Sequence, residues 1–135
     1  MEELRKILME QAKKISENSY SPYSKFPVGA CILYESKKTY TGCNVENASY
    51  GLTICAERNA MCSAIKEGEK TKILAIAIYS PKQKMCMPCG ACRQWLCEFA
   101  KDENIEIILE DNVKGLKVLT LEEIFPYGFK FEEQK

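Results

Sequence analysis

The 135-residue sequence contains no histidine, so a metal site in this chain has to be built from cysteine or carboxylate ligands. It also carries no net charge, because 19 Lys and Arg residues balance 19 Asp and Glu residues. A neutral chain offers no positive field for nucleic acid and no basic stripe for an anionic membrane. We therefore expect neither of these as a partner, and a small-molecule ligand instead.

Two kinds of segment are also missing. No apolar run approaches the roughly 20 residues that cross a bilayer, and the charged start, from Glu2 to Lys6, does not resemble a signal peptide. Both absences favour a cytoplasmic protein. A chain of 135 residues is long enough for one compact core and short for two domains of average size. We expect one domain over residues 1–135.

Cysteine is plentiful by contrast, with eight residues. In a short secreted chain that number would indicate a disulfide framework, whereas in a reducing compartment it indicates metal binding or thiols packed as small hydrophobic groups. For a lone cysteine on a regular element, the second role is the usual one. We expect it for Cys31, Cys43, Cys62 and Cys97.

The hydrophobic pattern alternates between helical and strand periods along the chain. Strands joined through helices indicate parallel pairing, and the strand at 28–34 with the one at 39–44 forms the one hairpin we expect. We predict a three-layer α/β/α sandwich with a mixed, mostly parallel five-stranded sheet. The predicted helices are 3–18, 55–67, 89–100 and a capped turn after Thr120, and the predicted strands are 28–34, 39–44, 73–79, 105–109 and 116–119.

Two distant segments supply metal-ligand chemistry: Cys55-Ala56-Glu57-Arg58, and Pro88-Cys89-Gly90-Ala91-Cys92-Arg93-Gln94. Cys89 and Cys92 are three residues apart and share one face of a helical turn, and Cys55 would complete a tripod. Each segment is expected where a strand gives way to a helix, at the carboxyl ends of neighbouring parallel strands. Catalytic zinc needs three protein ligands, an open position and a group that moves protons, and Glu57 fits the last role.

Three thiolates around one Zn²⁺ leave a net charge of minus one, which would weaken the acidifying effect of the metal on bound water. Nearby cations would offset that charge. Arg58 and Arg93 each stand close to a candidate ligand in the sequence. They are the candidates to donate hydrogen bonds to the sulfurs, and the sequence leaves open which arginine contacts which sulfur.

Other interpretations of the same residues stay open at this point. Cys86 precedes Cys89 and Cys92 with a spacing that also occurs in iron–sulfur proteins, and it could instead be the fourth ligand of a structural zinc. Neither site would require Glu57. Taken alone, Glu57 and Arg58 could equally belong to an ordinary solvated helix turn.

Taken together, these motifs resemble the cytidine deaminase family in its small homotetrameric form, whose zinc has three cysteine ligands. The resemblance extends over nearly the whole chain, in the order and spacing of the family. Beyond the two zinc motifs, it rests on Ser21-Pro22-Tyr23-Ser24-Lys25-Phe26, Val28-Gly29-Ala30 and Gly42-Cys43-Asn44-Val45-Glu46-Asn47-Ala48.

The resemblance implies a hydrolase of pyrimidine salvage that converts cytidine and 2′-deoxycytidine to uridine and 2′-deoxyuridine and releases ammonia. Cys55, Cys89 and Cys92 would bind one Zn²⁺ per subunit. Glu57 would take a proton from the water that zinc activates, protonate ring N3 and pass a proton to the departing ammonia. Main-chain amides near Ala56 and Cys89 would hold the edge of the pyrimidine.

By the same resemblance, Asn44 and Glu46 would bind the ribose hydroxyls and Phe26 would stack on the base. An acidic residue beside the ribose would favour a nucleoside over a nucleotide, because it repels a 5′-phosphate. Phe129 would close the pocket of a neighbouring subunit in a homotetramer.

Three alternatives of different kinds accompany this interpretation. A related zinc deaminase could act on another aminated base or on an aminopyrimidine antibiotic. A redox or structural metal protein would use Cys86 with Cys89 and Cys92. A nucleic-acid editing domain would need a basic groove and aromatic stacking platforms, which the charge balance disfavours.

Overall fold

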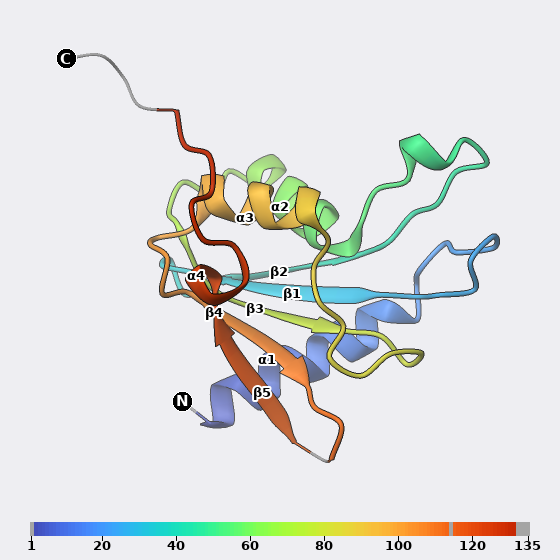
Figure 1. Cartoon of the computed structure of the whole chain (residues 1–135), viewed down its shortest axis with the longest axis horizontal. Helices are drawn as coiled ribbons and strands as arrows, with labels where there is room; N and C mark the ends of the chain where they lie inside the picture. The colour runs from blue at the N-terminus through green and yellow to red at the C-terminus, as the bar shows by residue number, and fades with distance from the viewer. Residues whose placement is uncertain (1, 114, 132–135) are drawn as a thin grey trace.

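The computed structural model describes residues 2–113 and 115–131 and contains one five-stranded sheet with helices on both faces. The strand order is β2-β1-β3-β4-β5. Figure 1 shows α2 and α3 on one face of the sheet and α1 on the other. The elements are α1 (Glu2–Ser16), β1 (Gly29–Tyr34), β2 (Thr39–Cys43), a 3₁₀ turn (Tyr50–Leu52), α2 (Ala56–Lys66), β3 (Ile73–Tyr79), α3 (Gly90–Phe99), β4 (Glu106–Glu110), β5 (Leu116–Thr120) and α4 (Leu121–Ile124).

The predicted three-layer sandwich is confirmed, and the predicted bounds of its elements agree with the structure to within two residues, but the prediction of a mostly parallel sheet is wrong. Within the described residues only β3 and β4 pair in parallel, whereas β1 pairs antiparallel with both β2 and β3, and β4 with β5. The connection from β2 through α2 to β3 does return the chain in the same direction. The sheet becomes mixed because β1 lies between those two strands.

A second hairpin, between β4 and β5, was also not predicted. Only residues 111–115 connect the two strands, which is too short for a crossover. The turn closes through the backbone N–H of Asp111, which donates to the carbonyl of Gly115 at 3.0 Å. An antiparallel edge strand therefore completes the sheet.

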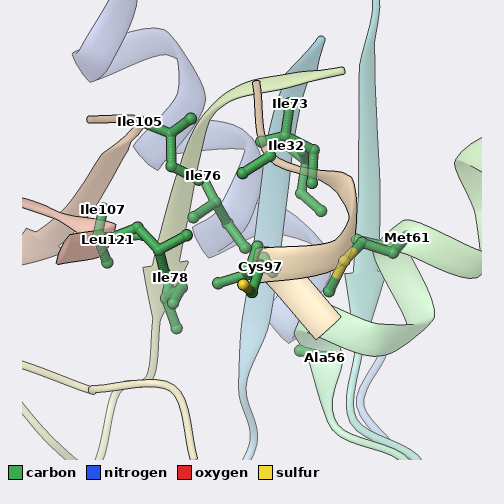
Figure 2. Packing of buried hydrophobic residues seen from close by; sticks show 14 of the residues in the cluster. Ile32, Ala56, Met61, Ile73, Ile76, Ile78, Cys97, Ile105, Ile107 and Leu121 are labelled. Carbon is green, nitrogen blue, oxygen red and sulfur yellow. The ribbon is translucent and has the colours of Figure 1, made fainter. Parts of the chain in front are cut away.

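Continuous apolar strands explain why the sheet is covered on both sides. Every residue of β1 is buried, and β3 is buried except at two positions. One face packs against α2 and α3, and the other packs against Leu8, Met9 and Ala12 of α1. Figure 2 shows side chains of the layer beneath α2 and α3, among them Ile32, Met61, Ile76, Ile78 and Cys97.

The close packing of α2 on the sheet depends on one glycine. A Cβ atom at Gly42 of β2 would lie 2.4 Å from the backbone nitrogen of Ala60 and 2.6 Å from the carbonyl oxygen of Ala56. Both of those atoms belong to the backbone of α2 and have no rotamer by which to move away. Glycine at this position therefore fixes how closely the first turns of α2 approach β2.

The remaining sequence predictions about the fold concern the last turn and the membrane. The capping box of α4 is confirmed: Thr120 Oγ1 accepts from the backbone N–H of Glu123 at 3.1 Å, and Glu123 Oε1 accepts from the backbone N–H of Thr120 at 2.8 Å. Among the described residues, no helix has both the length and the apolar character to cross a membrane.

Candidate metal centre and active site

Three cysteine sulfurs meet between the starts of α2 and α3. Cys55 Sγ lies 3.8 Å from Cys89 Sγ, Cys89 Sγ lies 3.5 Å from Cys92 Sγ, and all three atoms lie within 4.8 Å of one another. Sulfurs bound tetrahedrally to one zinc at about 2.3 Å are about 3.8 Å apart. The donor set, its softness and its spacing therefore fit a single Zn²⁺.

The fold brings the sulfurs together because both helices start at the same edge of the sheet. Cys55 is the N-cap of α2 and Cys89 is the N-cap of α3. The helices follow β2 and β3, which run in the same direction but are separated by β1, so the expectation of neighbouring parallel strands is wrong. Free backbone N–H groups and the positive end of each helix dipole favour thiolates at these positions.

Arg58 lies against the sulfurs. Its Nη2 donates a hydrogen bond of 3.3 Å to Cys55 Sγ. The pKa of the Cys55 thiol is lowered, first by its hydrogen bond with Cys92 and then by Arg58, against the opposing effect of burial. The thiolate in turn raises the pKa of the Arg58 guanidinium. Arg58 therefore supplies positive charge where three thiolates would accumulate negative charge around a bound Zn²⁺.

Arg93 does not share this role in the described structure. Its Nε donates to the carbonyl oxygen of Pro88 at 2.8 Å, and its Nη1 donates to the carbonyl oxygen of Ile124 at 2.6 Å. The expectation that it contacts a sulfur is corrected, because two carbonyl oxygens take up its guanidinium. Arg93 instead ties the loop before α3 to the end of α4.

Glu57 lies in the first turn of α2, directly after the Cys55 N-cap and Ala56. Its side chain is only 4% exposed. Burial is the main reason that the pKa of its carboxyl group is raised to about 7, and the nearby Cys55 thiolate adds to the shift. Glu57 is not part of the sulfur cluster, so it stands beside the metal ligands as a buried acid.

Cys86 lies near Glu57 but outside the cluster. Burial, followed by the charge of Glu57, raises the pKa of its thiol to about 11. Among the described residues, the one group of three or more candidate ligands within reach of a single ion is Cys55, Cys89 and Cys92. The alternatives that used Cys86 as a ligand, an iron–sulfur cluster or a four-cysteine zinc, are therefore not supported by the geometry.

The other four cysteines were expected to be buried as small hydrophobic groups, and they differ in burial. Cys31 and Cys97 are buried and Cys43 is half-buried, but Cys62 is exposed. Cys62 lies on the outer face of α2, two residues before the buried Ala64 and therefore on nearly the opposite side of the helix. The expectation for Cys62 was wrong because the usual role of a lone cysteine does not say which face of the helix the sheet covers.

Asn44 and Phe26 lie beside each other at the end of β2. Asn44 Nδ2 donates to the carbonyl oxygen of Phe26 at 2.9 Å, and Asn44 Oδ1 accepts from the backbone N–H of Val28 at 3.0 Å. Phe26 is partly buried against the core. Asn44 therefore fixes the backbone of the segment that carries Phe26.

Glu46 binds the same segment at Tyr23 and Ser24, a few residues before Phe26. Its Oε1 accepts from the backbone N–H groups of Tyr23 at 3.0 Å and Ser24 at 3.1 Å, and the Ser24 hydroxyl donates to its other oxygen. That hydroxyl is the main reason that the pKa of Glu46 is lowered. Glu46 also lines a hollow of about 340 Å³ with Tyr23, Ser24, Tyr50 and Thr53. Sequence reasoning missed Ser24, whose hydroxyl also accepts from the backbone N–H of Phe26 at 3.1 Å, because a serine in a loop carries no signal of its own.

Ala56 and Phe129 differ sharply in exposure. Ala56 is buried at the start of α2, directly after the ligand Cys55. Phe129 is 70% exposed, and its backbone bonds to the side chain of Gln94 on α3. Within this chain its ring is therefore directed away from the core.

Comparisons with known proteins agree with the geometry. Residues 2–107 match the family model of the cytidine and deoxycytidylate deaminase zinc-binding region. A cytidine deaminase of Sporosarcina psychrophila is 39% identical over 93% of this chain and 91% of its own length, and one of Halalkalibacterium halodurans is 37% identical over 96% of each. The crystal structure of a cytidine deaminase from Burkholderia pseudomallei superimposes with a TM-score of 0.83 at 40% identity, covering 92% of this chain and 98% of that one. With its three-cysteine cluster, this chain belongs to the cytidine deaminase family.

Proposed function

We propose that this chain hydrolyses cytidine and 2′-deoxycytidine to uridine and 2′-deoxyuridine, with release of ammonia, as a step of pyrimidine salvage. The observation that carries the proposal is a buried acid, Glu57, beside three sulfurs spaced for one zinc ion. A closed structural zinc site has four protein ligands and no need of such an acid. The family to which the chain belongs supports the same chemistry.

Bound at Cys55, Cys89 and Cys92, Zn²⁺ would supply the Lewis acidity that makes water a nucleophile at neutral pH. Glu57 would hold and move the protons. It would accept one from the attacking water, deliver one to ring N3 of the base, and transfer one to the departing amine. Its burial keeps bulk water away from these transfers.

We propose that the nucleoside lies between the helix starts and the segment around Phe26. Phe26 would stack on the base, and the backbone amides near Ala56 and Cys89 would bind the edge of the pyrimidine. Asn44 and Glu46 would bind the ribose hydroxyls. The hydrogen bonds that keep Glu46 ionised support a preference for nucleosides, because a fixed negative charge beside the sugar repels a 5′-phosphate.

The exposed aromatic residues support an assembly, which we propose to be a homotetramer in the cytoplasm. Tyr127, Phe129 and Phe131 are all more than two-thirds exposed, at 102%, 70% and 81%. Exposed apolar groups gathered on one segment are typical of association surfaces. In the tetramer Phe129 would close the pocket of a neighbouring subunit, and a site built from three thiols requires a reducing compartment.

The test is Glu57→Gln, with Glu67→Gln at the exposed end of α2 as the matched control. Loss of cytidine absorbance is followed in the ultraviolet, and zinc content is measured by atomic emission. We expect Glu57→Gln to retain one zinc and to lose roughly 10²–10⁴-fold in turnover, as when a general acid–base is removed. Near-normal turnover, or a wild-type chain that leaves cytidine unchanged at full zinc loading, would overturn the proposal.

A further inference from the structure

The side chain of Gln94 holds the backbone of Phe129 at two points. Gln94 Oε1 accepts from the backbone N–H of Phe129 at 3.2 Å, and Gln94 Nε2 donates to the carbonyl oxygen of Phe129 at 2.8 Å. A primary amide that binds both polar groups of one residue imitates the partner strand of a sheet. The backbone at Phe129 is therefore fixed in orientation as well as in position.

The segment before Phe129 is seated closely on the same helix. A Cβ atom at Gly128 would lie 2.7 Å from Cys97 Sγ and 2.8 Å from the ring of Phe125, so any other residue there would have to displace these two side chains. Arg93 bonds to the carbonyl oxygen of Ile124 at 2.6 Å. Figure 1 shows this segment, coloured red after α4, running past α3. The tail thus follows α3 from Ile124 to Phe129.

The ring of Phe129 is exposed, whereas its backbone is held by hydrogen bonds. Both backbone groups are bonded, while the side chain is 70% exposed. The ring therefore gains little packing inside the chain. An exposed aromatic ring on a fixed backbone is available for contact with a surface outside the chain.

We propose that Gln94 is a positioning residue, which sets Phe129 so that its ring can close the substrate pocket of a neighbouring subunit. The inference rests on the closure role proposed above for Phe129. Gln94 lies two residues after Cys92, so the helix turn that carries a metal ligand also fixes the closing ring. Movement of that turn would displace the ring and the ligand together.

The variant that tests this is Gln94→Met, which keeps side-chain length and helix propensity but removes both hydrogen bonds. The matched control is Glu98→Gln, one turn further along the exposed side of α3. Loss of two ordinary hydrogen bonds should raise the KM for cytidine about tenfold. The kcat and the zinc content should stay near the wild-type values, and Glu98→Gln should change none of the three.

A double variant separates positioning from a general structural role. In a Phe129→Ala background there is no ring to position, so Gln94→Met should raise KM by less than about twofold there. A tenfold effect of Gln94→Met that persists in the Phe129→Ala background overturns the inference. The inference is also overturned if Phe129→Ala alone raises the KM for cytidine but Gln94→Met leaves it unchanged.

A second measurement does not depend on activity. Trypsin cleaves after Lys130, next to the held residue, and mass spectrometry follows the loss of the peptide that begins at Phe131. Because cleavage tracks local opening, Gln94→Met should accelerate it about tenfold over Glu98→Gln. Equal rates overturn the inference. If Phe129→Ala leaves KM unchanged, the inference also fails while deamination stands, whereas a zinc-loaded wild-type chain inert to cytidine marks failure of the proposed function itself.

Discussion

Replacing Arg58 by Met should weaken zinc binding, and the structure indicates by how much. The guanidinium donates to Cys55 Sγ at 3.3 Å, and the thiolates of Cys55 and Cys92 both raise its pKa. Its Nε is buried and makes no hydrogen bond among the described residues. The guanidinium stays beside the sulfurs because its attraction to the thiolates outweighs the cost of leaving Nε without a hydrogen bond.

The magnitude follows from two opposing effects. At 3.3 Å and an effective dielectric constant of about 20, the attraction between unit charges is about 5 kcal/mol. Desolvation of the guanidinium offsets much of it, and hydrogen bonds to charged groups contribute a net of about 1.5–3 kcal/mol. A loss of about 2 kcal/mol corresponds to a zinc Kd raised roughly 30-fold, within the range seen when outer partners of metal ligands are removed.

The assay is competition for Zn²⁺ with a chromophoric chelator at pH 7.5, on wild type, Arg58→Met and Arg58→Lys. Arg58→Lys keeps the charge but not the planar fork, so its Kd should fall between the other two. Arg93→Met serves as a contrast, because its partners are carbonyl oxygens and its loss should lower thermal stability more than zinc affinity. The reasoning is refuted if Arg58→Met binds zinc within threefold of wild type.

Two further predictions concern stability. Gly42→Ala should lower the free energy of unfolding by about 3 kcal/mol and the Tm by about 10 °C, because its Cβ would press on the backbone of α2; Gly51→Ala, whose Cβ meets open space, is the control, and equal Tm values would contradict the packing argument. Hydrogen bonds, first of all from the Thr71 hydroxyl, lower the pKa of Glu69 to about 2, so the unfolded chain takes up this proton first and stability falls as pH drops from about 5 towards 2. The urea midpoint should therefore fall less between pH 6 and pH 3.5 in Glu69→Gln than in the wild type. An equal fall in the two proteins would refute the assignment of this pH dependence to Glu69.

The elements of the fold could be predicted because they depend on local patterns. The continuous apolar run of β1, the Thr120 and Glu123 pair and the charges between strands all act within a few residues. The order of the strands in the sheet does not depend on such local patterns. Burial on both faces fits a central strand in either a parallel or an antiparallel sheet, so nothing in the residues of β1 specified that it would separate β2 from β3.

The metal ligands were predictable for a similar reason. Cys89 and Cys92 share a helix turn, and helical geometry alone brings their sulfurs together. The two arginines were not distinguishable in this way, since each stands three or four residues after an N-cap cysteine. What separates them is the carbonyl oxygen of Ile124, which lies 31 residues beyond Arg93 and reaches it only in the folded chain.

The absence of histidine and the position of Arg58 are connected by charge. Neutral imidazole ligands leave the charge of Zn²⁺ intact, whereas three thiolates reverse it and oppose the ionisation of water. This chain restores part of the positive potential without a neutral ligand: Cys55 and Cys89 stand at the N-caps of α2 and α3, at the positive ends of the two helix dipoles, and Arg58 adds a full charge. The same arrangement explains why both helices begin at a cysteine, because only at a helix start can one residue be a thiolate ligand and receive the field of the helix.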